Sequence, residues 1–166
     1  MTRLTIVVDA NILISALITP GKVRRVFFHE KLHPVAPQRI VEETIKHTDT
    51  IARYTGIDKT ILKTILPETL TRWITTINTD EIPSSTIIKS RRLVRDVDPS
   101  DWPFVALAIH LGAPLWTGDK KLIRLALKTG DFKAVDTHGV EMLLQDKPWS
   151  EIEEEMRKRY LQEPTI

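Results

Sequence analysis

The sequence contains no cysteine, which excludes disulfide scaffolds, thiolate zinc sites and cysteine nucleophiles. It also lacks any apolar run of the roughly 18 residues that a membrane span needs, since the longest run, from Ile12 to Ile18, is interrupted by Ser15. The five histidines show no pairing at metal-ligand spacing, which argues against zinc. The first residues do not have the pattern of a cleaved signal. We therefore expect a cytoplasmic protein without membrane contact.

An excess of charge is missing as well, because 24 basic and 22 acidic residues leave a net charge of only +2. This balance neither demands nor excludes a nucleic-acid partner, so the local distribution of charge matters more. Hydrophobic residues make up 42% and charged residues 28% of the chain, close to the average of globular proteins. A chain of 166 residues can bury a substantial core without a structural metal, and we expect one domain.

Segments typical of strands alternate with segments typical of helices. Residues 4–8 are short, continuously apolar and β-branched, which predicts a buried first strand. Further strands are expected at 33–36, 77–82, 114–117 and 132–135, and helices at 11–17, 22–30, 58–76, 85–95, 101–111, 120–128 and 139–145. This alternation predicts an α/β fold with a parallel central sheet flanked by helices. The ligand crevice of such folds lies beyond the carboxyl ends of the strands.

Two prolines give further expectations. Pro37 is predicted to open a helix after the second strand, and Pro67 to divide 58–76 into two helices. A last helix is expected from Pro148, with a Ser150/Glu153 capping box and three i,i+4 ion pairs: Glu153–Arg157, Glu154–Lys158 and Glu155–Arg159. We therefore divide the chain into a main domain, residues 1–146, and a C-terminal helical extension, residues 147–166. We expect the extension to pack on that domain, with binding of a partner as the less common alternative.

Two aspartates follow predicted strands. Asp9 ends the first strand and Asp119 comes just after the fourth. If these strands are neighbours, both carboxylates project into the same crevice, where each raises the pKa of the other. A divalent cation relieves that repulsion, and ligands that are all oxygen select Mg²⁺ or Mn²⁺.

Other acidic residues lie near helix starts and have structural alternatives. Asp96, Asp98 and Asp101 crowd the start of one helix, and Glu42 and Glu43 lie early in another. Asp101 can stabilise a helix N-terminus, with Ser100 as the cap beside it, and Asp119 can cap the helix that begins at Lys120. Two adjacent glutamates suit a solvated helix face. Asp9 is the hardest to explain structurally, because a carboxylate that ends a buried apolar strand is costly unless it is paired or bound to metal.

Basic residues lie near these acids. Arg91, Arg92 and Arg95 belong to the helix that leads into the Asp96–Asp101 loop, and Lys120 follows Asp119. We consider these four residues as candidates for binding RNA phosphates, with an ordinary solvated helix face as the alternative.

Three motifs together resemble the PIN-domain nucleases, a family that includes toxin ribonucleases of toxin–antitoxin pairs. They are VVDANILIS, IVEET and DPSDWPFVALAIHLGAPLWTGDKKLI. The resemblance implies a parallel sheet flanked by helices and an endoribonuclease that hydrolyses RNA phosphodiesters with Mg²⁺ or Mn²⁺. It implies RNA as the substrate and admits two protein partners, a second copy docked through 58–76 and an antitoxin.

The resemblance also implies roles for single residues. It assigns catalysis and metal binding to four carboxylates: Asp9, Glu43, Asp101 and Asp119. It places three auxiliary residues beside them: Asn11, Asp98 and Thr117. Glu42 is the alternative to Glu43, and Asp98 competes with Asp101. Ser100 departs from the family pattern, in which a second acid is common, and residues 56–82 are longer than in compact toxins. The second departure weakens the toxin assignment more than the nuclease assignment.

Two other functions compete with this interpretation. One is a catalytically degenerate PIN domain that binds RNA or serves in assembly, which the retained Asp9, Asp101 and Asp119 argue against. The other is a phosphatase of the haloacid-dehalogenase type, which also has an aspartate after its first strand. That family needs a second aspartate where this chain has Asn11 and an acid where it has Ile123.

Overall fold

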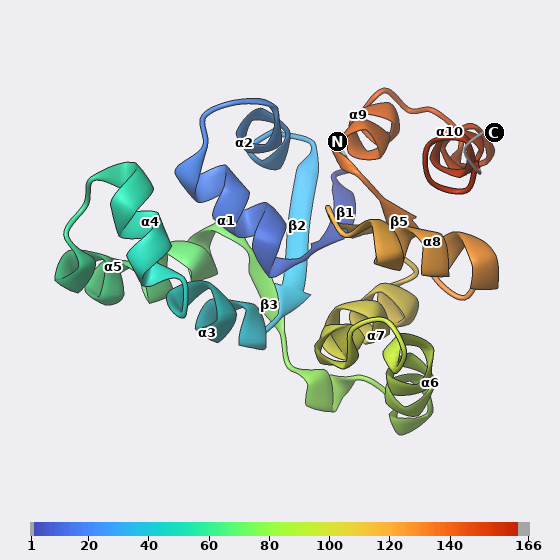
Figure 1. The fold of residues 1–166 in the computed structure, drawn as a ribbon, viewed down its shortest axis with the longest axis horizontal. Coiled ribbons are helices and arrows are strands. Elements are labelled where there is room, and N and C mark those ends of the chain that lie inside the picture. Colours follow the sequence, from blue (N-terminus) through green and yellow to red (C-terminus); the bar gives the residue numbers. More distant parts are fainter. Residues whose placement is uncertain (1, 163–166) are drawn as a thin grey trace.

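The computed structural model describes residues 2–162, which form a five-stranded parallel sheet in the order β3-β2-β1-β4-β5 (Figure 1). The strands are β1 (Leu4–Val8), β2 (Leu32–Pro37), β3 (Thr75–Ile77), β4 (Leu115–Trp116) and β5 (Ala134–Val135). The predicted α/β fold with a parallel central sheet is therefore confirmed. The third strand begins earlier than expected, and half of 77–82 is occupied by a 3₁₀ turn, η1 (Thr79–Glu81).

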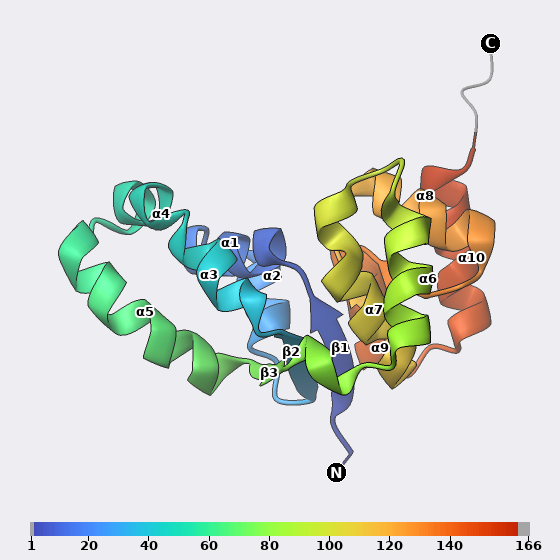
Figure 2. The same cartoon turned by 90° about the horizontal axis from the view of Figure 1, so that it is seen from below.

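Ten α-helices connect and cover the strands within the described residues. They are α1 (Ala10–Ile18), α2 (Lys22–Phe27), α3 (Arg39–Ile45), α4 (Thr48–Thr55), α5 (Lys59–Trp73), α6 (Ser84–Val94), α7 (Trp102–Leu111), α8 (Lys120–Thr129), α9 (Thr137–Leu144) and α10 (Trp149–Tyr160). In Figure 2, α1, α3, α4 and α5 lie on one side of β1, and α6, α7, α8 and α10 lie on the other. No helix within residues 2–162 is long and apolar enough to cross a membrane.

Strand β1 is the centre of the sheet. Its residues Ile6, Val7 and Val8 have no exposed surface, as expected for a continuously apolar strand. The chain runs from β1 to β2 and β3 on one side, and returns to the other side of β1 to form β4, where Val8 pairs with Trp116. The strand order therefore reverses between β1 and β4, and their carboxyl ends flank the crevice in which such folds bind ligands.

The prediction that Pro37 opens a helix is wrong, because Pro37 is the last residue of β2 and α3 begins at Arg39. A proline cannot donate to a sheet ladder, so it is tolerated where a strand ends. The next residue, Gln38, donates its backbone N–H to the Ile77 carbonyl at 3.1 Å and continues the contact with β3. Helix α4, which follows α3 closely, has no counterpart among the predicted elements.

The prediction that Pro67 divides residues 58–76 is also wrong, since α5 is one helix with Pro67 inside it. Pro67 cannot bond to the carbonyl of Lys63, but Lys63 is exposed and its carbonyl can be hydrated. Leu62, Leu66 and Leu70 are buried on both sides of the proline. Packing of this apolar face stabilises both halves of the helix in one line.

Helix α10 packs on the main domain as expected, with Ile152 and Met156 fully buried. The predicted capping box is absent, because the helix begins at Trp149 and Ser150 already lies in its first turn. Of the three predicted ion pairs, Glu153–Arg157 forms at 3.2 Å and Glu154–Lys158 at 3.8 Å. The third does not form, because Arg159 pairs with Asp136 before α9 at 2.9 Å instead of with Glu155.

We predict that Gly139→Ala destabilises the fold, because α9 approaches β5 at Gly139. A Cβ placed there would lie 2.8 Å from the Cβ of Val135 and 3.1 Å from its Cγ1. Such overlap costs about 1–3 kcal/mol, and the higher helix propensity of alanine offsets up to about 1 kcal/mol of it. Urea unfolding should therefore show a net loss of about 1 kcal/mol.

Gly118→Ala is the matched control, because a Cβ at Gly118 would meet no heavy atom within 4 Å and its φ is not in the left-handed region. We expect its unfolding midpoint to stay within the error of the wild type. Equal midpoints for the Gly139→Ala and Gly118→Ala proteins would contradict the packing of α9 described here.

Candidate functional site

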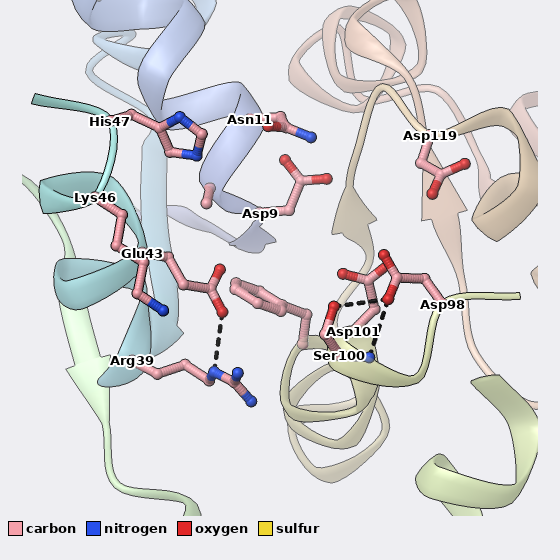
Figure 3. A pocket seen from close by; sticks show the side chains of 12 residues that line it. Asp9, Asn11, Arg39, Glu43, Lys46, His47, Asp98, Ser100, Asp101 and Asp119 are labelled. Carbon is pink, nitrogen blue, oxygen red and sulfur yellow. Dashed lines mark hydrogen bonds and ion pairs between the residues drawn. The ribbon is translucent and has the colours of Figure 1, made fainter. Parts of the chain in front are cut away.

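A pocket of about 400 Å³ lies at the carboxyl ends of β1 and β4 (Figure 3). Its walls come from the start of α1, from α3, from the loop and first turn of α7, and from the start of α8. The lining residues are Asp9, Ala10, Asn11, Arg39, Glu43, Lys46, His47, Asp98, Ser100, Asp101, Phe104 and Asp119. The structure thus brings into one pocket the four carboxylates that the sequence singled out, although they are spread over more than a hundred residues of chain.

Asp9 follows β1 directly and caps α1. Its Oδ1 accepts the backbone N–H of Ile12 at 2.9 Å, and its Oδ2 accepts the hydroxyl of Thr117. The side chain is only 8% exposed, and burial raises its pKa, as do the charges of Asp119 and Glu43 more weakly, while the two hydrogen bonds lower it. Within residues 2–162 no cationic side chain forms an ion pair with Asp9. Its charge therefore favours a cation in the pocket.

Thr117 connects the two strand ends. It is fully buried, donates its hydroxyl to Asp9, and accepts the backbone N–H of Asp119 at 3.0 Å. Asp119 in turn caps α8 through the N–H of Lys121 at 2.9 Å, using only its Oδ1. The capping role considered for Asp119 is thus real, and its second oxygen has no hydrogen-bond partner among the described residues. Thr117 does not line the pocket, but it contacts the carboxylate of Asp9 and the backbone of Asp119, and both aspartates do line it.

Asp101 is the last residue of a 3₁₀ turn, η2 (Pro99–Asp101), directly before α7. Its side chain forms no capping hydrogen bond, so capping does not explain its position. Burial, together with the negative charges of Asp98, Asp9, Asp119 and Glu43, raises the pKa of Asp101 to about 7. The acids around Asp101 therefore act on it as one electrostatic cluster.

Asp98 has a different environment. It is exposed and caps η2, accepting the backbone N–H of Ser100 at 3.0 Å and the Ser100 hydroxyl at 2.6 Å. The serine that departs from the family pattern is thus a partner of Asp98. Asp98 still lines the pocket, whereas the exposed Asp96 does not.

Of the two adjacent glutamates, Glu43 lines the pocket and Glu42 does not. Glu43 is half-buried and pairs with Arg39 at 2.9 Å, one helical turn earlier. Burial raises its pKa, Arg39 and Lys46 oppose that shift, and the charge of Asp98 adds to it. Glu42 is exposed and lines a neighbouring pocket instead. The placement follows from the roughly 100° between successive helical side chains.

Three cationic or polar side chains of the pocket were missed by the sequence analysis: Arg39, Lys46 and His47. They stand at positions −4, +3 and +4 from Glu43, on α3 and in the turn that follows it. Such spacing places side chains near Glu43, and it is the signal that could have found them. The cations that the sequence analysis named as candidates lie outside the pocket. These are Arg91, Arg92, Arg95 and Lys120.

The donor set fits a hard divalent cation in type and charge. Carboxylate oxygens predominate, and burial together with mutual repulsion raises the pKa of Asp9, Asp101 and Glu43. In the described side-chain positions of residues 2–162, no three His, Asp or Glu residues are close enough to hold one ion. Ligation by three carboxylates therefore requires them to draw closer together.

Comparison with known proteins gives one family match. A family model described as PIN domain matches residues 7–157, a range that contains every residue lining the pocket. A search of curated proteins found no match.

We predict that Asp9→Asn leaves the metal-free protein as stable as the wild type or more stable. The amide retains the shape and the cap to Ile12, and it removes a buried charge that has no cationic partner among the described residues. Asp136→Asn is the matched control. Like Asp9, Asp136 caps a helix and accepts a hydrogen bond from a hydroxyl, that of Tyr160 at 2.6 Å. Unlike Asp9, it forms an ion pair, with Arg159.

Thermal unfolding at pH 8 in EDTA measures both variants. Asp136→Asn should lower stability by about 1–3 kcal/mol, the usual contribution of hydrogen bonds to a charged group. A loss of similar size in Asp9→Asn would show that Asp9 is a structural residue whose charge the fold already satisfies.

Proposed function

The chain belongs to the PIN-domain family of nucleases, and from this premise we propose that it is a Mg²⁺- or Mn²⁺-dependent endoribonuclease that hydrolyses RNA phosphodiester bonds. The observation that supports the proposal most strongly is the pocket between β1 and β4. Four carboxylates from distant parts of the chain meet there, and the most buried of them, Asp9, has no ion pair with the described residues.

The metal-binding role falls to Asp9, Glu43, Asp101 and Asp119, with Asn11 and Asp98 as auxiliary groups at the same pocket. When bound, Mg²⁺ or Mn²⁺ supplies Lewis acidity at the scissile phosphate and lowers the pKa of a bound water. We infer a cytoplasmic protein with RNA as its partner, and products with 5′-phosphate and 3′-hydroxyl ends, as the resemblance implies.

The protein's own side chains orient this centre and bind the phosphate. Thr117 orients Asp9 and the backbone of Asp119 through its hydroxyl. Arg39 uses its Nε to bind Glu43, so the Nη groups of its guanidinium are available to a phosphate. Lys46 and His47 add donors on the same wall, and this positive wall faces the carboxylates (Figure 3). Such an arrangement suits an anionic substrate held against a metal centre.

The proposed protein partners concern helices α4 and α5. Their inner residues Ile51, Leu62 and Leu66 form a small buried cluster, while a row of large apolar side chains stays exposed. These exposed residues are Tyr54, Ile57, Ile61 and Ile65. A second copy of the chain or an antitoxin would cover this row, and the toxin role rests on the resemblance alone.

We predict that the wild type cleaves unstructured single-stranded RNA with Mg²⁺ or Mn²⁺ and that EDTA stops the reaction. Asp9→Asn and Glu43→Gln should each lower kcat/KM by at least about 100-fold, because each removes a charged metal ligand. Glu68→Gln is the matched control, since Glu68 pairs with Arg72 at i,i+4 as Glu43 does with Arg39, but the pair lies on the exposed face of α5. It should cleave at the wild-type rate.

Glu42→Gln separates the two adjacent glutamates. A loss of cleavage in Glu42→Gln together with normal cleavage in Glu43→Gln would show that the choice of Glu43 is wrong. EDTA-insensitive cleavage by Asp9→Asn would refute the metal mechanism. Binding of RNA by the wild type without cleavage, across varied sequences, would favour the binding-module alternative.

A further inference from the structure

A second pocket, of about 320 Å³, adjoins the acidic pocket. It is formed by the start of α3, the 3₁₀ turn η1 and the first residues of α7, and its lining residues are Gln38, Arg39, Glu42, Thr79, Trp102 and Pro103. The volume lies within the range of small-ligand sites, roughly 300–1,000 Å³. Of the residues that line this pocket, the mechanism described above uses only Arg39.

Two features connect the second pocket to the acidic pocket. Arg39 lines both, so its guanidinium stands at their boundary. Trp102, which lines the second pocket, directly follows Asp101, which lines the first. Successive Cα atoms are only about 3.8 Å apart. A group that fills the second pocket is therefore an immediate neighbour of one held among the carboxylates.

The indole of Trp102 supplies a flat surface for a ligand. The side chain is partly exposed, and the guanidinium carbon of Arg91 lies 4.5 Å from its ring centroid. Trp102 lines the second pocket, whereas Arg91 is not among the described residues that do so. Nucleobases stack on such aromatic surfaces in proteins that bind single-stranded nucleic acid, and nearby arginine strengthens the binding.

We propose that this second pocket binds the nucleobase adjacent to the scissile phosphate, stacked against Trp102, with Arg39 contacting the phosphate that connects that nucleotide to the acidic pocket. The proposal rests on the proposed ribonuclease function. Gln38 offers both a donor and an acceptor at the pocket wall, so it can bond to the edge of any base. The subsite therefore requires a base without specifying which one.

The test combines a change in the RNA with a change in the protein. The substrates are otherwise identical oligoribonucleotides, each lacking the base at one position. For the wild type, removal of the base next to the cleaved bond should raise KM at least about tenfold, as stacking contributions per base indicate. Trp102→Leu should raise KM for intact RNA by a similar factor and should no longer distinguish intact from abasic RNA.

Two further variants control for folding and for aromatic residues in general. Trp102→Phe retains an aromatic ring and should keep part of the difference between intact and abasic RNA. Trp149→Leu is the matched control, since Trp149 is also partly exposed and also lies beside a cation, Lys133 at 5.0 Å, but on α10. It should cleave both RNAs as the wild type does.

Equilibrium binding of the same RNAs in EDTA, followed by fluorescence anisotropy, separates failure of the subsite from failure of the nuclease function. If the wild type cleaves no RNA yet loses affinity for one abasic RNA, and Trp102→Leu removes that loss, the subsite holds and the ribonuclease proposal fails. Equal binding and cleavage of intact and abasic RNA by the wild type would overturn the subsite. The subsite would also be overturned if the fold-change in KM from Trp102→Leu and the fold-change from base removal multiplied when combined, because that shows that the two act independently.

Discussion

The carboxylate of Asp9 is buried at the end of β1, and no cationic side chain among the described residues pairs with it. Burial makes its charge unfavourable, and Asp119 and Glu43 add repulsion. The neighbouring carboxylates also repel the charge of Asp101, and burial and this repulsion together raise its pKa to about 7. A protein that maintains such a cluster loses stability unless a cation occupies the pocket, and this need connects the fold to the proposed chemistry.

The topology of the sheet creates this cluster. Reversal of the strand order between β1 and β4 opens a crevice where Asp9 and Asp119 both follow strands. Thr117 then connects the two aspartates through its hydroxyl. Helix α3 contributes Glu43 together with Arg39, so the same element supplies a metal ligand and a cation for the substrate. The N-terminus of α7 supplies Asp101 and, one residue later, Trp102, the aromatic residue of the proposed base subsite.

The sequence was informative wherever a local pattern decides the structure. The apolar run of β1 and the aspartates after strands predicted the sheet and the acidic pocket, since burial of β1 and parallel pairing follow from the pattern. The predictions were wrong where packing between distant residues decides the structure. Pro67 does not break α5, because the apolar face of that helix is buried. Arg159 pairs with Asp136 and not with Glu155 of its own helix. Charge clustering made Arg91 on α6 a candidate for binding phosphate, whereas the cations that line the pocket are those at helical spacing from Glu43.

Thermal unfolding at pH 8, with and without Mn²⁺, tests most directly whether the carboxylate cluster binds a cation. Because the folded-state pKa of Asp101 is about 7, above its usual value near 3.8, the metal-free fold should gain stability as pH falls from about 8 towards 5. At pH 8, Mn²⁺ at one hundred times its Kd should raise the free energy of unfolding of the wild type by about 2.7 kcal/mol, and its Tm should rise accordingly. Asp101→Asn should be more stable than the wild type without metal and gain less from Mn²⁺. An unchanged wild-type Tm, or an equal gain in Asp101→Asn, would contradict the account.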